Sequence, residues 1–309
     1  MAQMDITAKD RLQALCREKD IPVLWEEPMK NHTSFKIGGP ATALCTPKNR
    51  DQLAALLCYL QENKVDNWFV GNGSNLLVRD EGLDGVVVLL DGDFDGDIVV
   101  DHNIVEAPAG KKLSAVCAAA CQHGLSGLEF AYGIPGSVGG AVYMNAGAYG
   151  GEMRDRLVWC EYLLADGQIC RLPVEKLNLS YRHSCFMDVL AGACIVRAAF
   201  LLQEGSQPEI QEKMDDIYQR RRDKQPLEYP SAGSTFKRPE GAFAAKLIDD
   251  CGLRGFSVGG AQVSQKHAGF VINANHATCA DVLALTDKVR QIVRDKTGFT
   301  LELEVRLLP

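Results

Sequence analysis

Residues 133–151 read GIPGSVGGAVYMNAGAYGG and carry seven glycines in 19 positions. Ordering a glycine costs more chain entropy than ordering any other residue, so few structural roles require so many. Glycine also leaves room for a bound group to come close to the backbone. This stretch, called here the second glycine loop, therefore favours a ligand approached by backbone over a simple connector.

A shorter glycine-rich segment lies upstream. Residues 69–78 read FVGNGSNLLV, so a short apolar strand leads into two glycines and three small polar residues at 71–75, called here the first glycine loop. Consecutive backbone N–H groups in such a loop can bind an anion such as a phosphate. The spacing is not the dinucleotide-binding fingerprint, because Leu76 stands at the third glycine position, and it does not match a Walker A loop. Taken alone, the segment favours an ordinary tight turn.

Apolar periodicity around these loops predicts both helices and strands. Helical spacing occurs over 53–60 and over 113–121, and Gly124 follows the second stripe as a helix cap would. Strands are predicted at 68–70, 86–90, 104–107 and 195–202, and a hairpin is predicted from 158–164 with 168–172. Because helices and strands do not alternate regularly, we expect an α+β fold.

The pattern changes beyond Gly205. An amphipathic helix around Met214 is followed by helices over 242–251 and 281–296, and Thr278 with Asp281 has the spacing of a capping box. Apolar and charged residues alternate strictly over 301–307. This alternation predicts a closing strand with one buried face.

Composition limits the classes of function. Apolar residues make up 46% of the 309 residues and charged residues 24%, and no run approaches the roughly 20 apolar residues that cross a bilayer. The N-terminal residues lack the basic and apolar regions of a signal peptide, so we expect a cytoplasmic protein without membrane insertion. A net charge of −7 argues against a nucleic-acid partner.

Cysteine and histidine spacing points away from a metal. The 11 cysteines are scattered singly, without CxxC pairs, and the six histidines form no HExxH pattern. We interpret the cysteines as small buried hydrophobic residues in a reducing compartment and predict no metal site.

Basic residues gather locally in this acidic chain. Arg220, Arg221, Arg222 and Lys224 fall within about one helical turn, and Lys237 and Arg238 follow. Such a cluster can form a pocket for an anionic small molecule. From charge alone, a solvated helix end explains the cluster equally well.

Taken together, these segments resemble the UDP-N-acetylenolpyruvoylglucosamine reductase family, also called UDP-N-acetylmuramate dehydrogenases. The resemblance runs from about residue 31 to residue 308 and rests on landmarks that occur in the family's order. They are NHTSFKIGG at 31–39, the two glycine loops, Tyr181-Arg182, AGSTFKRP at 232–239 and Glu304-Val305-Arg306.

The resemblance implies a fold and cofactors. The family has a two-lobed FAD-binding unit of the p-cresol methylhydroxylase type and a C-terminal α+β substrate-binding domain, and it uses FAD with NADPH as co-substrate. We expect the first lobe with an N-terminal helix at 1–90, the second at 91–205, the substrate-binding domain at 206–300 and a C-terminal strand at 301–309. Some members carry an insertion after the active-site arginine whose tyrosine clamps the substrate. Here 183–196 runs on compactly, so the chain resembles the subgroup without that insertion.

The resemblance also implies roles for individual residues. Arg182 and Glu304 would polarise and stabilise the carboxylate of UDP-N-acetylglucosamine enolpyruvate, and Ser234 would supply a proton. Candidate cofactor-binding residues are Gly71, Asn72, Gly73, Ser74, Asn75, Gly136, Ser137, Gly139, Gly140, Asn145, Gly147, Val196, Arg221 and His267. Candidate substrate-binding residues are Lys224, Lys237, Arg238 and Gln262, and Lys266 is a possible neighbour. We expect a monomer or weak dimer.

Other interpretations remain open at this stage. Without the family, Ser234 would be a turn residue, Arg182 a surface ion-pair residue and Glu304 part of the polar face of a strand. The runner-up function is an FAD-dependent oxidase of the same superfamily acting on an alcohol or sugar. A third is a non-catalytic module that binds nucleotide sugars.

Overall fold

The computed structural model describes residues 6–309. Residues 1–5, which we expected in the first lobe, lie outside the described residues. The chain forms two compact units. Among the described residues, unit 1 comprises 6–25, Thr42–Asn72 and Asp84–Gln219, and unit 2 comprises Glu26–Ala41, Gly73–Leu83 and Arg220–Pro309. The boundary therefore passes through the first glycine loop, between Asn72 and Gly73.

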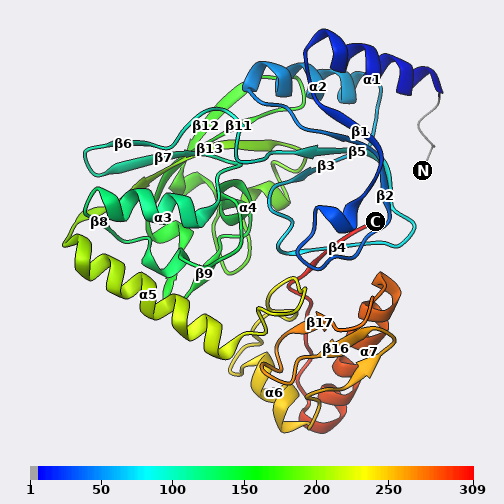
Figure 1. Ribbon diagram of the computed structural model, residues 1–309, viewed down its shortest axis with the longest axis vertical. Helices are drawn as coiled ribbons and strands as arrows, with labels where there is room; N and C mark the ends of the chain where they lie inside the picture. The colour runs from blue at the N-terminus through cyan, green and yellow to red at the C-terminus, as the bar shows by residue number, and fades with distance from the viewer. Residues whose placement is uncertain (1–5) are drawn as a thin grey trace. The chain divides into compact units, whose positions relative to one another are not determined.

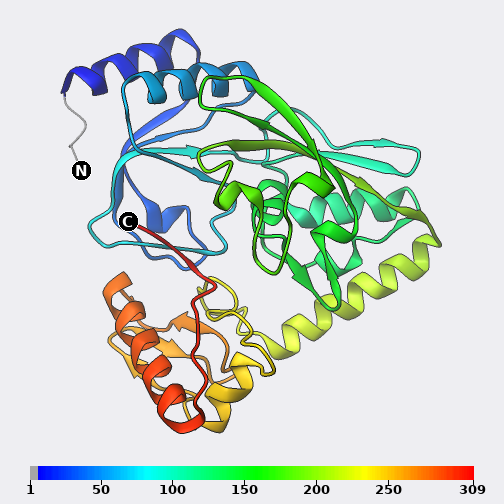
Figure 2. The same cartoon turned by 180° about the vertical axis from the view of Figure 1, so that it is seen from behind.

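Unit 1 contains most of a four-stranded sheet and the whole of a five-stranded sheet. The first has the order β1-β2-β5-β3, with β1 at Val23–Pro28, β2 at Pro40–Cys45, β5 at Leu83–Leu89 and β3 at Asn67–Val70. Helices α1 (Ile6–Glu18) and α2 (Arg50–Glu62) lie side by side in both views (Figures 1 and 2). The predicted face of α2 is confirmed, because Leu53, Leu56, Leu57 and Leu60 are all buried.

The five-stranded sheet has the order β12-β11-β13-β7-β6. Its strands are β12 (Ile169–Pro173), β11 (Leu157–Leu163), β13 (Cys194–Leu201), β7 (Ile104–Pro108) and β6 (Val99–Asp101). The predicted hairpin is confirmed by the antiparallel pairing of β11 with β12. Helices α3 (Leu113–Gln122) and α4 (Val138–Tyr143) pack on this sheet, α3 against β7 and α4 against β13. Short pairs complete the unit: β8 (Leu125–Ser126) with β14 (Gln203–Glu204), and β9 (Gly147–Ala148) with β10 (Gly151–Glu152).

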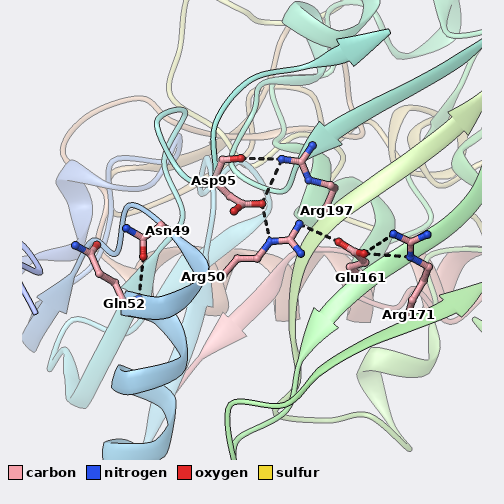
Figure 3. Close-up of polar contacts among 7 residues, drawn as sticks. All are labelled: Asn49, Arg50, Gln52, Asp95, Glu161, Arg171 and Arg197. Carbon is pink, nitrogen blue, oxygen red and sulfur yellow. Dashed lines mark hydrogen bonds and ion pairs between the residues drawn. The ribbon is translucent and has the colours of Figure 1, made fainter. Parts of the chain in front are cut away.

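An ion network fastens the start of α2 to the five-stranded sheet (Figure 3). Arg50 lies between two carboxylates, with Nε 2.8 Å from Asp95 Oδ2 and Nη2 2.8 Å from Glu161 Oε2. Arg197 donates to the Asp95 carbonyl at 2.7 Å, and Arg171 donates to Glu161 Oε1 at 2.6 Å. Burial would raise the pKa of Glu161, but its bonds to Arg171 and Arg50 outweigh burial and hold that pKa below its ordinary value. The network thereby joins helix α2 to three strands.

Unit 2 has its own core. Strands β15 (Ser257–Val258), β16 (Ala261–Val263) and β17 (Val271–Asn273) form a sheet that α7 (Cys279–Thr297) covers, and α6 (Ala244–Asp250) packs on α7. The predicted capping box is present: Thr278 accepts from the Asp281 N–H, and Asp281 accepts from the Thr278 N–H. Phe35 and Ile37, from the segment 31–39, are buried in this core. Helix α5 (Gln207–Lys224) runs across the boundary between the units.

The C-terminal strand is shorter than predicted. Only Arg306–Leu308 forms a strand, β18, which pairs in parallel with β4 (Leu76–Val78). Leu301 and Val305 are buried as the alternation predicts, but Leu307 is 37% exposed. The segment 302–304 instead contacts an irregular segment around Phe236. No helix within residues 6–309 is long and apolar enough to span a membrane.

Candidate functional site

The first glycine loop is shaped by a close contact within unit 2. Gly73 has a φ of +58°, and a Cβ atom at this position would overlap the carbonyl oxygen of His32. The Gly73 carbonyl in turn accepts from the Ser34 N–H at 3.1 Å. The segment 31–39 is therefore the surface against which this part of the loop folds, and glycine is required at position 73 by the protein itself.

Three consecutive amides of this loop are available to a ligand. Within residues 6–309, the backbone N–H groups of Asn72, Gly73 and Ser74 donate to no acceptor. The Asn72 side chain donates to the Pro135 carbonyl. Successive amides that lack protein acceptors are what a bound phosphate requires.

Asn75 connects the first glycine loop to the segment that bears Glu304. Its side-chain Nδ2 donates to the Glu304 carbonyl at 3.1 Å, and its own carbonyl accepts from the Arg306 N–H at 2.9 Å. These bonds continue into the pairing of β4 with β18. Asn75 is thus committed to holding Glu304, while the preceding residues keep free N–H groups.

Ser234 and Glu304 lie on facing segments. The Glu304 N–H donates to the Thr235 carbonyl at 2.8 Å, and the Lys237 N–H donates to the Glu302 carbonyl at 2.9 Å. Thr235 is 1% exposed, and its hydroxyl accepts from the Val271 N–H at 2.8 Å. Ser234 itself is exposed and makes no hydrogen bond within the described residues. Unit 2 therefore brings these two predicted catalytic residues together.

His267 is linked to the segment that carries Ser234 and Thr235 through Gly269. Its Nδ1 accepts from the Gly269 N–H at 3.1 Å, and the Gly269 carbonyl accepts from the Thr235 N–H at 2.9 Å. Burial, and secondarily the charge of Arg254, lowers the pKa of His267 below its ordinary value. An Nδ1 that accepts a hydrogen bond is unprotonated, which agrees with that direction.

The second glycine loop, in unit 1, is bonded mainly to the protein. Ser137 caps α4 by accepting from the Gly140 N–H at 3.4 Å. The N–H groups of Val138 and Gly139 donate to the carbonyls of Lys111 and Ala109, each at 2.9 Å. A Cβ at Gly139 would lie 2.9 Å from the Ala109 Cβ, whereas one at Gly140 would meet only Ser137 Oγ at 3.5 Å. Gly139 is thus required by packing, and Gly140 faces open space.

Two further cofactor candidates form the frame of this loop. The Gly136 carbonyl accepts from the Leu113 N–H at 3.0 Å. Val196 is fully buried in β13, and its carbonyl accepts from the Ala109 N–H at 2.8 Å. The backbone of Val196 contributes to the loop frame through Ala109 and then Gly139.

Arg182 lies in a tight turn beside the second glycine loop. Ser180 and His183 exchange backbone hydrogen bonds of 3.2 and 3.1 Å, and Arg182 within the turn has a φ of +55°. Such a conformation costs a non-glycine residue about 1–3 kcal/mol and persists only where its surroundings fix it. The guanidinium donates to the Gly147 carbonyl at 3.3 Å and lies 5.0 Å from the Tyr181 ring.

Asn145 lies at the centre of this arrangement. It is fully buried with a φ of +41°, and its side chain bonds to Glu152, Ser180 and Arg154. Ser184, which sequence reasoning missed, is also fully buried and donates to the Tyr143 carbonyl at 2.7 Å. No signal in the sequence marked Ser184 out, because its partner is a backbone carbonyl 41 residues away.

The basic candidates of unit 2 differ in their surroundings. Lys224, the last residue of α5, is exposed, and its side chain makes no interaction within the described residues. Lys237 is paired with Glu302 at 3.3 Å, and Arg238 lies 4.9 Å from the Phe243 ring. Arg221 bonds to Gln225, and Gln262, an uncharged candidate, bonds to Ser257. Lys266 donates to the carbonyl of Arg222, 44 residues away in the chain.

The structure thus gathers the candidates into two groups. Unit 1 holds Arg182 with Asn145 and Gly147, and unit 2 holds Ser234, Glu304 and Asn75. The free amides of the first glycine loop fit a phosphate group, as FAD has. Within residues 6–309, no set of three or more His, Cys, Asp or Glu side chains is arranged to hold a metal ion.

Comparison with known proteins gives matches along most of the chain. Residues 41–173 match an FAD binding domain, and residues 225–308 match the UDP-N-acetylenolpyruvoylglucosamine reductase C-terminal domain. A UDP-N-acetylenolpyruvoylglucosamine reductase of Lachnoclostridium phytofermentans is 50% identical over 289 residues, covering 93% of each chain. One from Caldanaerobacter subterraneus subsp. tengcongensis is 45% identical and covers 97% of each chain. The crystal structure of the Thermus caldophilus reductase matches with a TM-score of 0.78 at 36% identity, over 94% of this chain and 99% of that one.

Proposed function

The chain belongs to the UDP-N-acetylenolpyruvoylglucosamine reductase family, and from this premise we propose that it reduces UDP-N-acetylglucosamine enolpyruvate to UDP-N-acetylmuramate with NADPH. The chain contains an FAD-binding domain. FAD, when bound, supplies the hydride chemistry that links the two substrates. The reaction would be a step in the synthesis of peptidoglycan precursors.

The adjacency of Ser234 and Glu304 carries the proposal. In the reaction one carbon of the enol ether gains hydride and its neighbour, which bears the carboxylate, gains a proton. The 2.8 Å bond from Glu304 N–H to the Thr235 carbonyl sets the proposed proton donor beside the proposed carboxylate-stabilising residue. The exposed Ser234 hydroxyl has no competing acceptor within residues 6–309. These facts support a proton-donating role for Ser234.

Arg182 is the proposed partner of the substrate carboxylate. An arginine can hold a carboxylate through two parallel N–H bonds, and it stabilises negative charge as it develops there. Its guanidinium donates to the Gly147 carbonyl at 3.3 Å, which places it beside the second glycine loop. Glu304 is proposed to act on the same carboxylate.

The remaining candidate residues are proposed to bind either the FAD diphosphate or the substrate diphosphate. The amides of the first glycine loop and the α4 region with Gly136, Ser137, Gly139 and Gly140 would hold the FAD diphosphate. Lys224 is the leading candidate for the substrate diphosphate because its ammonium is uncommitted within residues 6–309. Lys237, Arg238 and Gln262 are further candidates. We also propose a reducing, cytoplasmic location, which the 11 free thiols support.

The absorption spectrum and the stoichiometry of turnover test this function. The purified protein should be yellow and should oxidise one NADPH for each UDP-N-acetylglucosamine enolpyruvate consumed, with a product two hydrogens heavier. A protein that is colourless after incubation with FAD and removal of the unbound cofactor would overturn the proposal. So would oxidation of a sugar or alcohol by O₂ without NADPH, which would favour the flavin oxidase instead.

A further inference from the structure

The turn that carries Arg182 is fastened to the second glycine loop by three hydrogen bonds. The first joins Asn145 Nδ2 to the Ser180 carbonyl at 3.0 Å. The second is the 3.3 Å bond from the Arg182 guanidinium to Gly147, and the third joins Ser184 Oγ to the Tyr143 carbonyl at 2.7 Å. The bonds hold the start, the middle and the end of the segment 180–184, and all lie within unit 1.

The Asn145 side chain is fully committed to the protein. Its amide nitrogen carries two hydrogens, and these go to Glu152 Oε2 and the Ser180 carbonyl, each at 3.0 Å. Its oxygen accepts from the Arg154 N–H at 3.0 Å. Because both N–H groups are used and the side chain is fully buried, Asn145 has no side-chain donor left for a cofactor.

Packing alone does not fix the Arg182 turn. Tyr181 is 46% exposed and Ser180 is also exposed, so the turn lies at the surface of unit 1. On its far side His183 bonds to the Asn178 carbonyl at 3.1 Å and to Asp188 at 3.2 Å. Two of the bonds that hold the left-handed turn at Arg182 come from fully buried side chains, those of Asn145 and Ser184.

We propose that Asn145 and Ser184 are positioning residues, which act on the reaction only by holding the Arg182 guanidinium where the substrate carboxylate is bound. This inference rests on the proposed function of Arg182. It reassigns Asn145 from a cofactor contact to a support for a catalytic residue. Both side chains are fully buried, which fits a role exerted through Arg182.

Ser184→Ala is the sharpest variant because it removes one hydroxyl and adds no atoms. We expect kcat to fall by about tenfold with little change in KM, since a small misplacement of a catalytic group costs rate more than ground-state binding. Flavin content and the rate of flavin reduction by NADPH should stay unchanged. Asn145→Ala should slow the reduction of the enolpyruvyl substrate by a larger factor, about a hundredfold.

A double-mutant cycle separates positioning from general destabilisation. In single-turnover experiments, Ser184→Ala should slow reduction of the enolpyruvyl substrate by about tenfold in the native background. It should slow the reaction less than twofold when Arg182 is already alanine, because residues that act through one group are non-additive. Thr286→Val is the matched control: it removes another buried hydroxyl, 1% exposed and bonded to the Leu283 carbonyl at 2.9 Å, from α7 in unit 2. Its activity should match the native protein.

The possible outcomes are distinct. Equal slowing by Ser184→Ala in both backgrounds, or no slowing in the native background, would overturn the positioning role. Loss of flavin from Asn145→Ala in a folded protein would return Asn145 to the cofactor. If Asn145→Ala does not fold, Ser184→Ala still decides the question. Should Arg182→Ala alone leave turnover unchanged, the proposed function of Arg182 fails, and the positioning inference falls with it.

Discussion

In the first glycine loop the N–H groups of Asn72, Gly73 and Ser74 have no acceptor within residues 6–309, whereas in the second loop those of Val138, Gly139 and Gly140 donate to protein acceptors. Both segments are rich in glycine, small and polar residues. Glycine content therefore identifies close approach of a backbone, but it does not tell whether the approaching group is a ligand or the protein itself.

The two loops also support different catalytic candidates. The first loop continues through Asn75 to Glu304, whose N–H binds the carbonyl next to Ser234. The second continues through Asn145 and Gly147 to the Arg182 turn. Substitutions in the first loop and the residues bonded to it should thus affect proton delivery and cofactor retention. Substitutions in the second loop and the residues bonded to it should affect Arg182, the proposed partner of the substrate carboxylate.

Ser234→Ala gives the largest expected effect and tests the first loop's side of this comparison. Flavin reduction by NADPH should be nearly unaffected, because no proton donor to carbon is needed there. Reduction of the enolpyruvyl substrate should slow by roughly 10²-fold to 10⁴-fold, the usual contribution of a positioned general acid. Stopped-flow absorbance of the flavin separates the two half-reactions. Ser234→Cys should retain more activity than Ser234→Ala, and slowing confined to the NADPH step would show that the proton-donor role is wrong.

Gly73→Val should remove FAD from the protein. A valine there would be β-branched at a φ of +58° and would overlap the His32 carbonyl, so the loop would have to move. A backbone strain of about 2–3 kcal/mol corresponds to roughly a hundredfold weaker binding. Flavin content after purification is the measurement. Normal occupancy in a folded variant would mean that the free amides of this loop do not hold the cofactor.

Sequence reasoning predicted most regular elements because their signals are local. The buried stripe of α2, the β11–β12 hairpin and the capping box of α7 each depend on residues within a short window. The closing strand was overpredicted for the opposite reason. Alternation over 301–307 shows which side chains can be buried, but pairing needs a partner, and only 306–308 finds one in β4. The residues before it instead contact the segment around Phe236.

The candidate site was accessible to sequence reasoning only through the family resemblance. Nothing in the composition links Ser234 to Glu304, because the bond between their segments joins residues about 70 positions apart. The supporting residues were harder still. Ser184 and Thr235 act through hydrogen bonds to or from backbone groups, and a backbone group leaves no trace in the sequence.

Alanine at two adjacent glycines should distinguish protein contact from ligand contact in the second loop. Gly139→Ala forces a Cβ to within 2.9 Å of the Ala109 Cβ, so it should destabilise the apoprotein by about 1–3 kcal/mol. Gly140→Ala meets only Ser137 Oγ at 3.5 Å and lies in a helix, so the apoprotein should be as stable or gain roughly 0.5–1 kcal/mol.

FAD affinity should decrease in Gly140→Ala even though the stability of the apoprotein does not. If FAD approaches its open side, Gly140→Ala weakens FAD binding by about tenfold, or about 1.4 kcal/mol, without any loss of apoprotein stability. Thermal unfolding without FAD and titration with FAD measure the two quantities separately. Unchanged FAD affinity would remove Gly140 from the cofactor site and make the second loop purely structural at this point.

The smallest effect concerns His267, which supports Thr235 through Gly269 on the first loop's side. Burial and the charge of Arg254 lower the pKa of His267 in the folded state, whereas the unfolded chain has the ordinary value of about 6.5. Above that pH the ring is neutral in both states. As the pH falls below about 6.5, the unfolded chain binds the proton first, so the free energy of unfolding decreases. This loss continues until the pH reaches the lowered pKa of the folded state, and it amounts to about 1.4 kcal/mol for each unit by which the two pKa values differ. The native protein should therefore lose more thermal stability between pH 7.5 and pH 5 than His267→Gln does. Identical pH profiles for the native protein and His267→Gln would mean that His267 does not titrate against folding and that the Gly269 bond does not depend on its neutral form.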